Sequence, residues 1–132
     1  MTTREQEIRT WSMLCHLSAL AILFIPFGNL LGPLIVWQIK RKELPEIDPH
    51  AKESINFQIT LVIITIIFSI FLAGSIGYGV LIQSPVTMIT SGIGLALFLA
   101  FIQFVGLILV IIGGIKANNG ELYNYPGFKF LK

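Results

Sequence analysis

Two long stretches without a charged side chain constrain this 132-residue chain more than any other feature. Thirty residues lie between Arg9 and Lys40, and sixty-two lie between Glu53 and Lys116, with no Asp, Glu, Lys or Arg among them. A helix rises about 1.5 Å per residue and the hydrocarbon core of a bilayer is about 30 Å thick, so one crossing needs about 20 residues. The longer stretch therefore predicts two membrane-crossing helices.

The turn within the longer stretch is expected at Gln83, Ser84 and Pro85, the strongest group of helix-breaking residues in it. The two helices then lie at about residues 49–82 and 86–117. Both are longer than a perpendicular crossing requires, so we expect them to tilt or to extend into the headgroup layer.

The shorter stretch allows two interpretations, because thirty residues are too many for one crossing and too few for two of ordinary length. Residues 25–33 are rich in Pro and Gly, which break helices. Either one helix crosses and the remainder lies flat, or two short helices at about residues 10–26 and 29–42 form a hairpin with a tight Pro/Gly turn. Basic residues flank the stretch on both sides, and their preference for the cytoplasm favours the hairpin.

These patterns predict an all-α fold, an integral membrane four-helix bundle. It forms a single transmembrane domain over residues 1–132, with an interfacial C-terminal tail at 118–132. Basic residues gather near the N-terminus, between the second and third helices and after the fourth helix, whereas the turn near Pro85 is uncharged. We therefore expect a multi-pass protein of the cell membrane with both termini in the cytoplasm.

Composition argues against several classes of function. Charged residues make up 12% of the chain, and its Lys and Arg residues form no basic block, so no nucleic-acid partner is expected. A single cysteine, Cys15, excludes a disulfide framework and a multi-cysteine metal site. We expect no metal, no cofactor and no enzymatic activity, because no nucleophile–base pair, carboxylate pair or phosphate-binding loop stands out.

A histidine lies within the first apolar stretch. Ser12, His16 and Ala19 share one face of the first expected helix, so His16 should point at another helix. One explanation is a neutral histidine that forms hydrogen bonds within the bundle, and the other is a proton relay or ligand. The first is favoured, because a relay usually needs an Asp or Glu at the same depth.

Amide side chains mark the two long helices. Asn56 and Gln58 lie on opposite sides of the third helix, which should therefore contact neighbours on two sides. On the fourth helix, Ala96, Ala100 and Gln103 share a broad face of small residues suited to close helix packing. Ordinary packing accounts for these residues, and a narrow polar path lined by the three amides is the alternative.

The start of the third helix carries a cluster of polar and charged residues. His50, Lys52 and Glu53, together with Arg41 and Lys42, form the expected surface for a partner on the cytoplasmic side. A basic rim that meets anionic lipid is the other explanation.

The chain resembles the small four-helix membrane subunit of the chloroplast inner-envelope protein translocon, the Tic complex, and its bacterial relatives. The resemblance is carried by Trp11 with His16, by Pro26, Asn29, Gly32-Pro33 and Trp37, by His50-Ala51-Lys52-Glu53 with Asn56-Phe57-Gln58, and by Lys116-Ala117, Gly120-Glu121 and Tyr125-Pro126. It implies four helices, in agreement with the charge pattern.

The resemblance also implies a function, either structural or associated with protein translocation, and an oligomeric channel or transporter for ions or small solutes is the alternative. The expected partners are the lipid bilayer, other membrane proteins, translocating polypeptides and further copies of the chain. The candidate partner and packing residues are His16, His50, Lys52, Glu53, Asn56, Gln58, Ala96, Ala100 and Gln103.

Overall fold

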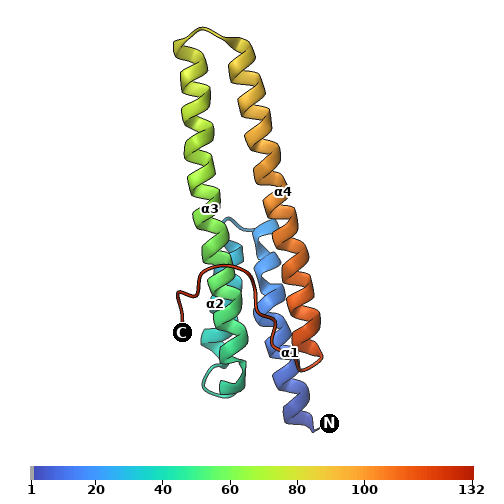
Figure 1. Ribbon diagram of the computed structural model, residues 1–132. Helices are drawn as coiled ribbons and strands as arrows, with labels where there is room; N and C mark the ends of the chain where they lie inside the picture. Colours follow the sequence, from blue (N-terminus) through green and yellow to red (C-terminus); the bar gives the residue numbers. More distant parts are fainter. Residues whose placement is uncertain (1) are drawn as a thin grey trace. The chain divides into compact units, whose positions relative to one another are not determined.

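The computed structural model describes residues 2–132 and is all-α, as the sequence predicts (Figure 1). Two short helices precede two long ones, and each short 3₁₀ segment joins a helix end. The elements are α1 (Thr3–Leu17), η1 (Ser18–Leu23), α2 (Gly28–Lys40), η2 (Pro45–Ile47), α3 (Asp48–Leu81) and α4 (Pro85–Asn118).

The first helix differs most from its predicted range of 10–26. It begins at Thr3 because Thr2 and Glu5 form a capping box, in which the Thr2 hydroxyl accepts from the Glu5 backbone N–H and the Glu5 carboxylate accepts from the Thr2 backbone N–H. It ends at Leu17, where the chain tightens into η1. The other three helices begin and end within two residues of the predicted positions.

Two of the four helices are long and apolar enough to cross a membrane, namely α3 and α4, each of 34 residues. With 15 residues in α1 and 13 in α2, the first two helices are shorter than the about 20 residues that a crossing requires. The contacts group the chain into two compact units: the residues up to Thr60 together with Leu107–Lys132, and the residues Leu61–Gly106. We call these unit 1 and unit 2.

Unit 1 contains a small apolar core around the segment between α2 and α3. The buried residues Cys15, Leu44, Ile47 and Ala51 form it, and Ile8, Trp11, Val36 and Trp37 pack against it. The Lys40 ammonium lies 4.8 Å from the centre of the Trp11 ring, a cation–π contact between the last residue of α2 and the middle of α1. Arg4 Nη2 donates to both carboxylate oxygens of Glu46, at 2.8 and 3.1 Å, and so links α1 to η2.

The turn between η1 and α2 brings two backbones very close together. Phe27, which precedes α2, adopts a left-handed conformation with φ 61°. A side chain on Gly28 would meet the backbone of Ala21, and one on Gly32 would meet the backbone of Ser18. Glycine is therefore required at both positions for this turn to close as it does.

Unit 2 consists of the distal part of α3, the first part of α4 and the turn between them. Most of its large apolar side chains are exposed, as expected of helices in contact with lipid. Within the unit, the Phe68 and Phe98 rings lie 4.8 Å apart, and the Gln103 amide donates a 2.7 Å hydrogen bond to the Thr65 hydroxyl. The turn falls at Gln83 and Ser84, as predicted.

Candidate functional site

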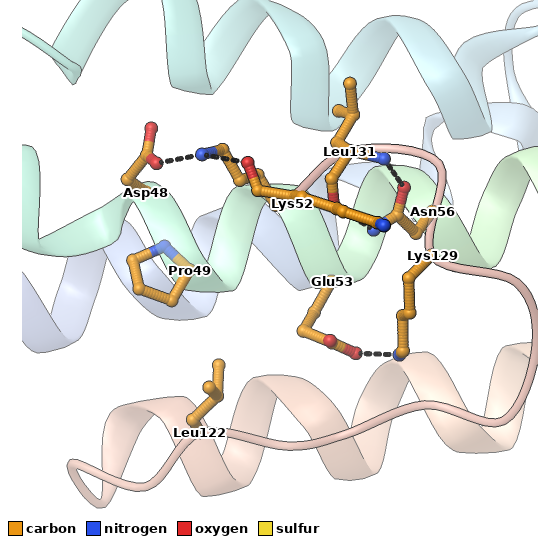
Figure 2. Close-up of a pocket in the computed structure, with 9 residues that line it drawn as sticks. Asp48, Pro49, Lys52, Glu53, Asn56, Leu122, Lys129 and Leu131 are labelled. Atoms are coloured by element: carbon orange, nitrogen blue, oxygen red, sulfur yellow. Dashed lines mark hydrogen bonds and ion pairs between the residues drawn. The ribbon is translucent and has the colours of Figure 1, made fainter.

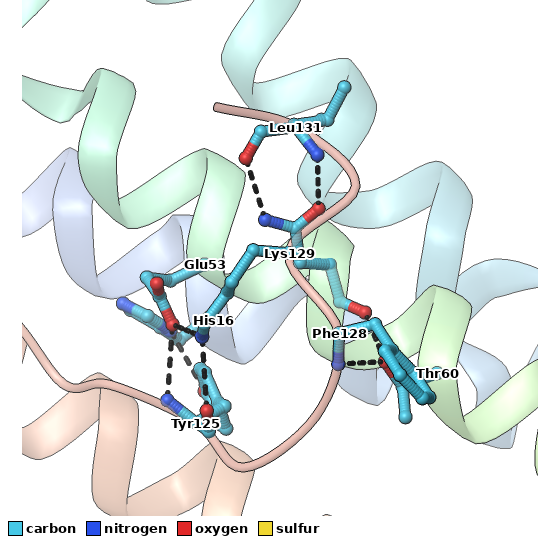
Figure 3. A network of polar contacts seen from close by, with 8 residues as sticks. His16, Glu53, Thr60, Tyr125, Phe128, Lys129 and Leu131 are labelled. Carbon is cyan, nitrogen blue, oxygen red and sulfur yellow. Dashed lines mark hydrogen bonds and ion pairs between the residues drawn. The ribbon is translucent and has the colours of Figure 1, made fainter.

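The C-terminal tail, residues 119–132, forms no helix or strand and lies against the first turns of α3 in unit 1 (Figure 3). The Asn56 side chain holds it by two bonds to Leu131, because the Asn56 amide donates to the Leu131 carbonyl at 2.9 Å and the Leu131 N–H donates to Asn56 Oδ1 at 2.7 Å. The Thr60 hydroxyl accepts a further bond from the Phe128 N–H at 3.2 Å. One face of α3 thus supplies side-chain partners for the backbone of the tail.

A charged pair lies at the centre of this contact. Glu53 Oε2 accepts from Lys129 Nζ at 2.6 Å and from the Tyr125 N–H at 3.1 Å. The Glu53 side chain is only 13% exposed, whereas that of Lys129 is 41% exposed. The carboxylate therefore has charge-assisted bonds that compensate for its partial loss of hydration.

Tyr125 inserts into the unit next to the buried histidine of α1. Its hydroxyl lies 2.8 Å from His16 Nδ1, and its ring stacks on Phe57 with 4.4 Å between the ring centres. Burial, with Tyr123 and Glu53 nearby, raises the pKa of the Tyr125 hydroxyl, so this group keeps its proton and can donate to Nδ1. That arrangement leaves the proton of a neutral His16 on Nε2, which lies 3.3 Å from His50 Nδ1.

The structure thus brings together five of the predicted residues: His16, His50, Lys52, Glu53 and Asn56. As expected, Ser12 and His16 of α1 and Ala19 of η1 are all buried, and His16 contacts a side chain of another helix. The candidate site in unit 1 is therefore a network that joins α1, α3 and the tail.

An open pocket of about 370 Å³ lies beside the network (Figure 2). Its lining residues are Asp48, Pro49, Lys52, Glu53, Asn56, Leu122, Lys129, Leu131 and Lys132. The ammonium of Lys52 pairs with Asp48 at 2.8 Å and donates to the Lys132 carbonyl at 3.1 Å. The other carboxylate oxygen of Asp48 accepts from Trp37 Nε1 at 2.7 Å, so this residue connects the start of α3 to α2.

Gln58 confirms the expectation that α3 contacts neighbours on two sides. Its side-chain oxygen accepts a 3.1 Å bond from the Asn29 amide of α2, while Asn56 holds the tail on the other side of the helix. The amides of Asn56 and Gln58 are therefore both bonded within unit 1.

The three remaining candidate residues lie in unit 2. Gln103 bonds to Thr65 of the facing helix, and Ala96 and Ala100 are exposed. Their small side chains do not contribute to a buried interface within the chain. A role for this face in contact with a partner stays a prediction.

Sequence reasoning missed the partners of these residues. The tyrosine at position 125 was expected at the membrane interface and is instead 3% exposed. Leu131 takes part through its backbone, which carries no residue-specific signal, and Asn29 and Thr65 bond to single amides far away in the sequence. A tail with four aromatic residues was the only indication that it would pack against the helices.

A comparison with protein families decides where this chain belongs. The sequence model of the MamF/MmsF family, described as the magnetosome magnetite crystal formation protein family, matches residues 7–131. The chain belongs to this family. No curated protein and no solved structure matches the chain.

Membership of the MamF/MmsF family corrects the resemblance to the Tic translocon subunit and the translocation-associated function inferred from it. The structure gives a reason for the error. Trp37, Asn56 and Gln58, which carried part of the resemblance, form bonds that hold unit 1 together. Such residues are determined by the way short helices pack around a longer one. A shared packing pattern does not establish a shared function.

Proposed function

We propose that this chain acts in the formation of magnetite crystals as a membrane-embedded protein without catalytic activity of its own. The observation that carries the proposal is the family match over residues 7–131. The two helices long and apolar enough to span a bilayer support a place in the membrane that encloses the growing crystal.

Topology is part of this proposal. Unit 1 contains both ends of the chain, the loop between α2 and α3 and the tail, and all nine Lys and Arg residues belong to it. The preference of basic residues for the cytoplasm supports a topology with the two termini on that side and the uncharged turn at Gln83 on the other. Reporter fusions at either terminus should therefore give a cytoplasmic signal, and an extracytoplasmic N-terminus would contradict the proposed topology.

The partners proposed are the lipid bilayer, other membrane proteins and further copies of the chain. The exposed small residues Ala96 and Ala100 support this, because they allow another helix to approach α4 closely. Gly74 and Gly77 of α3 likewise have no atom within 4 Å of the position that a Cβ would take. Unit 2 thus exposes small residues on both of its helices.

The test is complementation in magnetosome-forming cells whose own member of this family has been deleted. Expression of this chain should restore the size distribution of the magnetite crystals measured by electron microscopy. A double variant, Ala96→Leu with Ala100→Leu, should restore it less well, and Leu97→Ile, an exposed apolar exchange on the same helix, serves as the control. The proposed function would be contradicted if the wild-type chain reached its normal level in the membrane and the crystals kept the size distribution of the deletion strain.

A further inference from the structure

The turn between η1 and α2 exposes an unusual concentration of apolar side chains. Phe24 is 87% exposed, Phe27 is 67% and Leu23 is 65%, with Ile25 also exposed. We call residues 23–27 the hairpin tip. No polar side chain occurs from Ala19 to Gly28, so the side chains of this tip offer water no hydrogen-bonding group.

Several backbone donors in and beside the tip are bonded within the turn. The N–H groups of Phe24 and Ile25 both donate to the Ala21 carbonyl, at 3.1 and 2.9 Å, and Gly28 N–H donates to the Ile25 carbonyl at 3.0 Å. Pro26 has no N–H group to satisfy. A turn in which these three donors are bonded internally is suited to hydrocarbon, where water offers no alternative partner.

The length of α2 limits how deep this tip can reach. The 13 residues of α2 extend about 20 Å at about 1.5 Å each, from the tip to Lys40. Lys40 marks the headgroup level, and its contact with Trp11 places the charged end of α2 beside α1. A hydrocarbon core of about 30 Å is therefore too thick for this hairpin to cross.

A bond to α3 gives the depth independently. Asn29, two residues after the tip, bonds to Gln58, which lies ten residues into α3, or about 15 Å from its start at Asp48. Beyond Gln58 the same helix continues to Leu81 without a charged residue, a further distance of about 35 Å. The tip is thus level with the interior part of a helix long enough to span the membrane.

We propose that α1, η1 and α2 form a re-entrant hairpin, which enters the hydrocarbon core and leaves it on the same side, with residues 23–27 in contact with lipid acyl chains. Its exposed phenylalanines bind the membrane interior, and the packing of His16 against His50 of α3 keeps it upright. This proposal concerns the contact with lipid and does not depend on a role in crystal formation.

Cysteine accessibility in proteoliposomes tests the proposal. The full chain carries Cys15→Ser, which removes the buried native thiol, and one new cysteine at Phe24, Lys42 or Ile82. Lys42 lies in the basic loop after α2, and Ile82 lies at the uncharged turn, so each marks one surface of the membrane. A membrane-impermeant maleimide is added outside one set of vesicles and enclosed within a second set. Labelling of the Lys42 and Ile82 variants shows how the protein is oriented in the vesicle membrane.

We expect Phe24→Cys to react at least about tenfold more slowly than either control from both sides, since the tip is screened from water by lipid. Labelling from the Ile82 side would show a complete crossing, and labelling from the Lys42 side would show a hairpin at the surface. Either result overturns the proposal.

A nitroxide on the same cysteine gives a second measurement. Collisions with oxygen should exceed collisions with a water-soluble nickel complex at Phe24, as they should at Ile70, an exposed position within α3. If the nitroxide lies deep in the bilayer at Ile70 but near its surface at Phe24, the re-entrant hairpin is wrong while the membrane insertion of α3 stands. If it lies near the surface at both positions, membrane insertion of the whole chain is wrong. Because Phe24 is 87% exposed, its replacement leaves the packing of unit 1 intact.

Discussion

The contacts within unit 1 differ in kind from the contacts within unit 2, although α3 and α4 contribute residues to both units. In unit 1, side-chain hydrogen bonds and ion pairs connect α1, α2, α3 and the tail, and most residues from Ala51 to Thr60 are buried. In unit 2, the bond between Gln103 and Thr65 is the single side-chain hydrogen bond between helices among the described residues Leu61–Gly106. Specific polar contacts therefore define unit 1, while unit 2 is free to present its apolar surface to lipid or to a partner.

Among the substitutions considered, replacement of the buried tyrosine of the tail should lower the free energy of unfolding most. Tyr125→Ala removes a stacked ring and the partner of His16, and we expect it to lower the free energy of unfolding by about 3–5 kcal/mol, as for other buried aromatic residues. Phe128→Ala, at a residue that is 69% exposed, should cost far less. Thermal unfolding in detergent measures both, and equal losses would show that the tail is not docked through Tyr125.

Glycine substitutions sharpen the same comparison. Gly32→Ala forces α2 away from the Ser18 backbone and should destabilise the protein by about 1–3 kcal/mol, whereas Gly77→Ala meets open space and should stabilise α3 by about 0.5–1 kcal/mol. Opposite shifts of the melting temperature are the expected result. A loss of stability at Gly77 as large as that at Gly32 would show that unit 2 has a close neighbour at that position.

Amide substitutions should have smaller effects. Hydrogen bonds between membrane helices contribute about 0.6 kcal/mol on average and up to about 1.7 kcal/mol, so Asn56→Leu, which removes two bonds to the tail, should loosen unit 1 without unfolding it. Gln103→Leu removes one bond and should cost less. If Asn56→Leu left the unfolding temperature unchanged but abolished complementation, a direct functional role for Asn56 would explain the result better than packing.

The smallest change in stability is expected at the exposed face of α4. Ala96→Leu meets no neighbour within the chain, so the melting temperature of the monomer should change by less than the error of the measurement. Association should weaken if another helix packs there, and cross-linking in native membranes measures that. Unchanged cross-linking would remove Ala96 from the set of partner residues.

The sequence allowed the helices of this fold to be predicted because lipid imposes a simple rule on charge. The two chargeless stretches located α2, α3 and α4 and only the second half of α1, and the two-sided polarity of α3 indicated neighbours on both faces. The early start of α1 was also readable, since Thr2 and Glu5 have the spacing of a capping box. The helix α1 is too short to cross because η1 begins at Ser18, and no sequence pattern marked that point.

The sequence indicated which residues form the candidate site, but it did not indicate their hydrogen-bond partners. His16, Glu53 and Asn56 stood out as polar groups near or within apolar helices, which must find partners. Their partners include the backbone of Leu131 and the N–H of Tyr125, which any residue could offer. Function was inferred wrongly because residues that serve packing were taken as the mark of a particular family.

The docked tail also bears on the order in which the chain folds. The bond between His16 and Tyr125 joins residues 109 positions apart, and those between Asn56 and Leu131 join residues 75 apart, whereas Gln103 and Thr65 are separated by 38. Closing a longer loop costs more entropy and slows the formation of the contacts that depend on it. The α3–α4 hairpin can therefore pair while the N-terminal helices still await the tail, and the network around His16 is among the last parts of the protein to form.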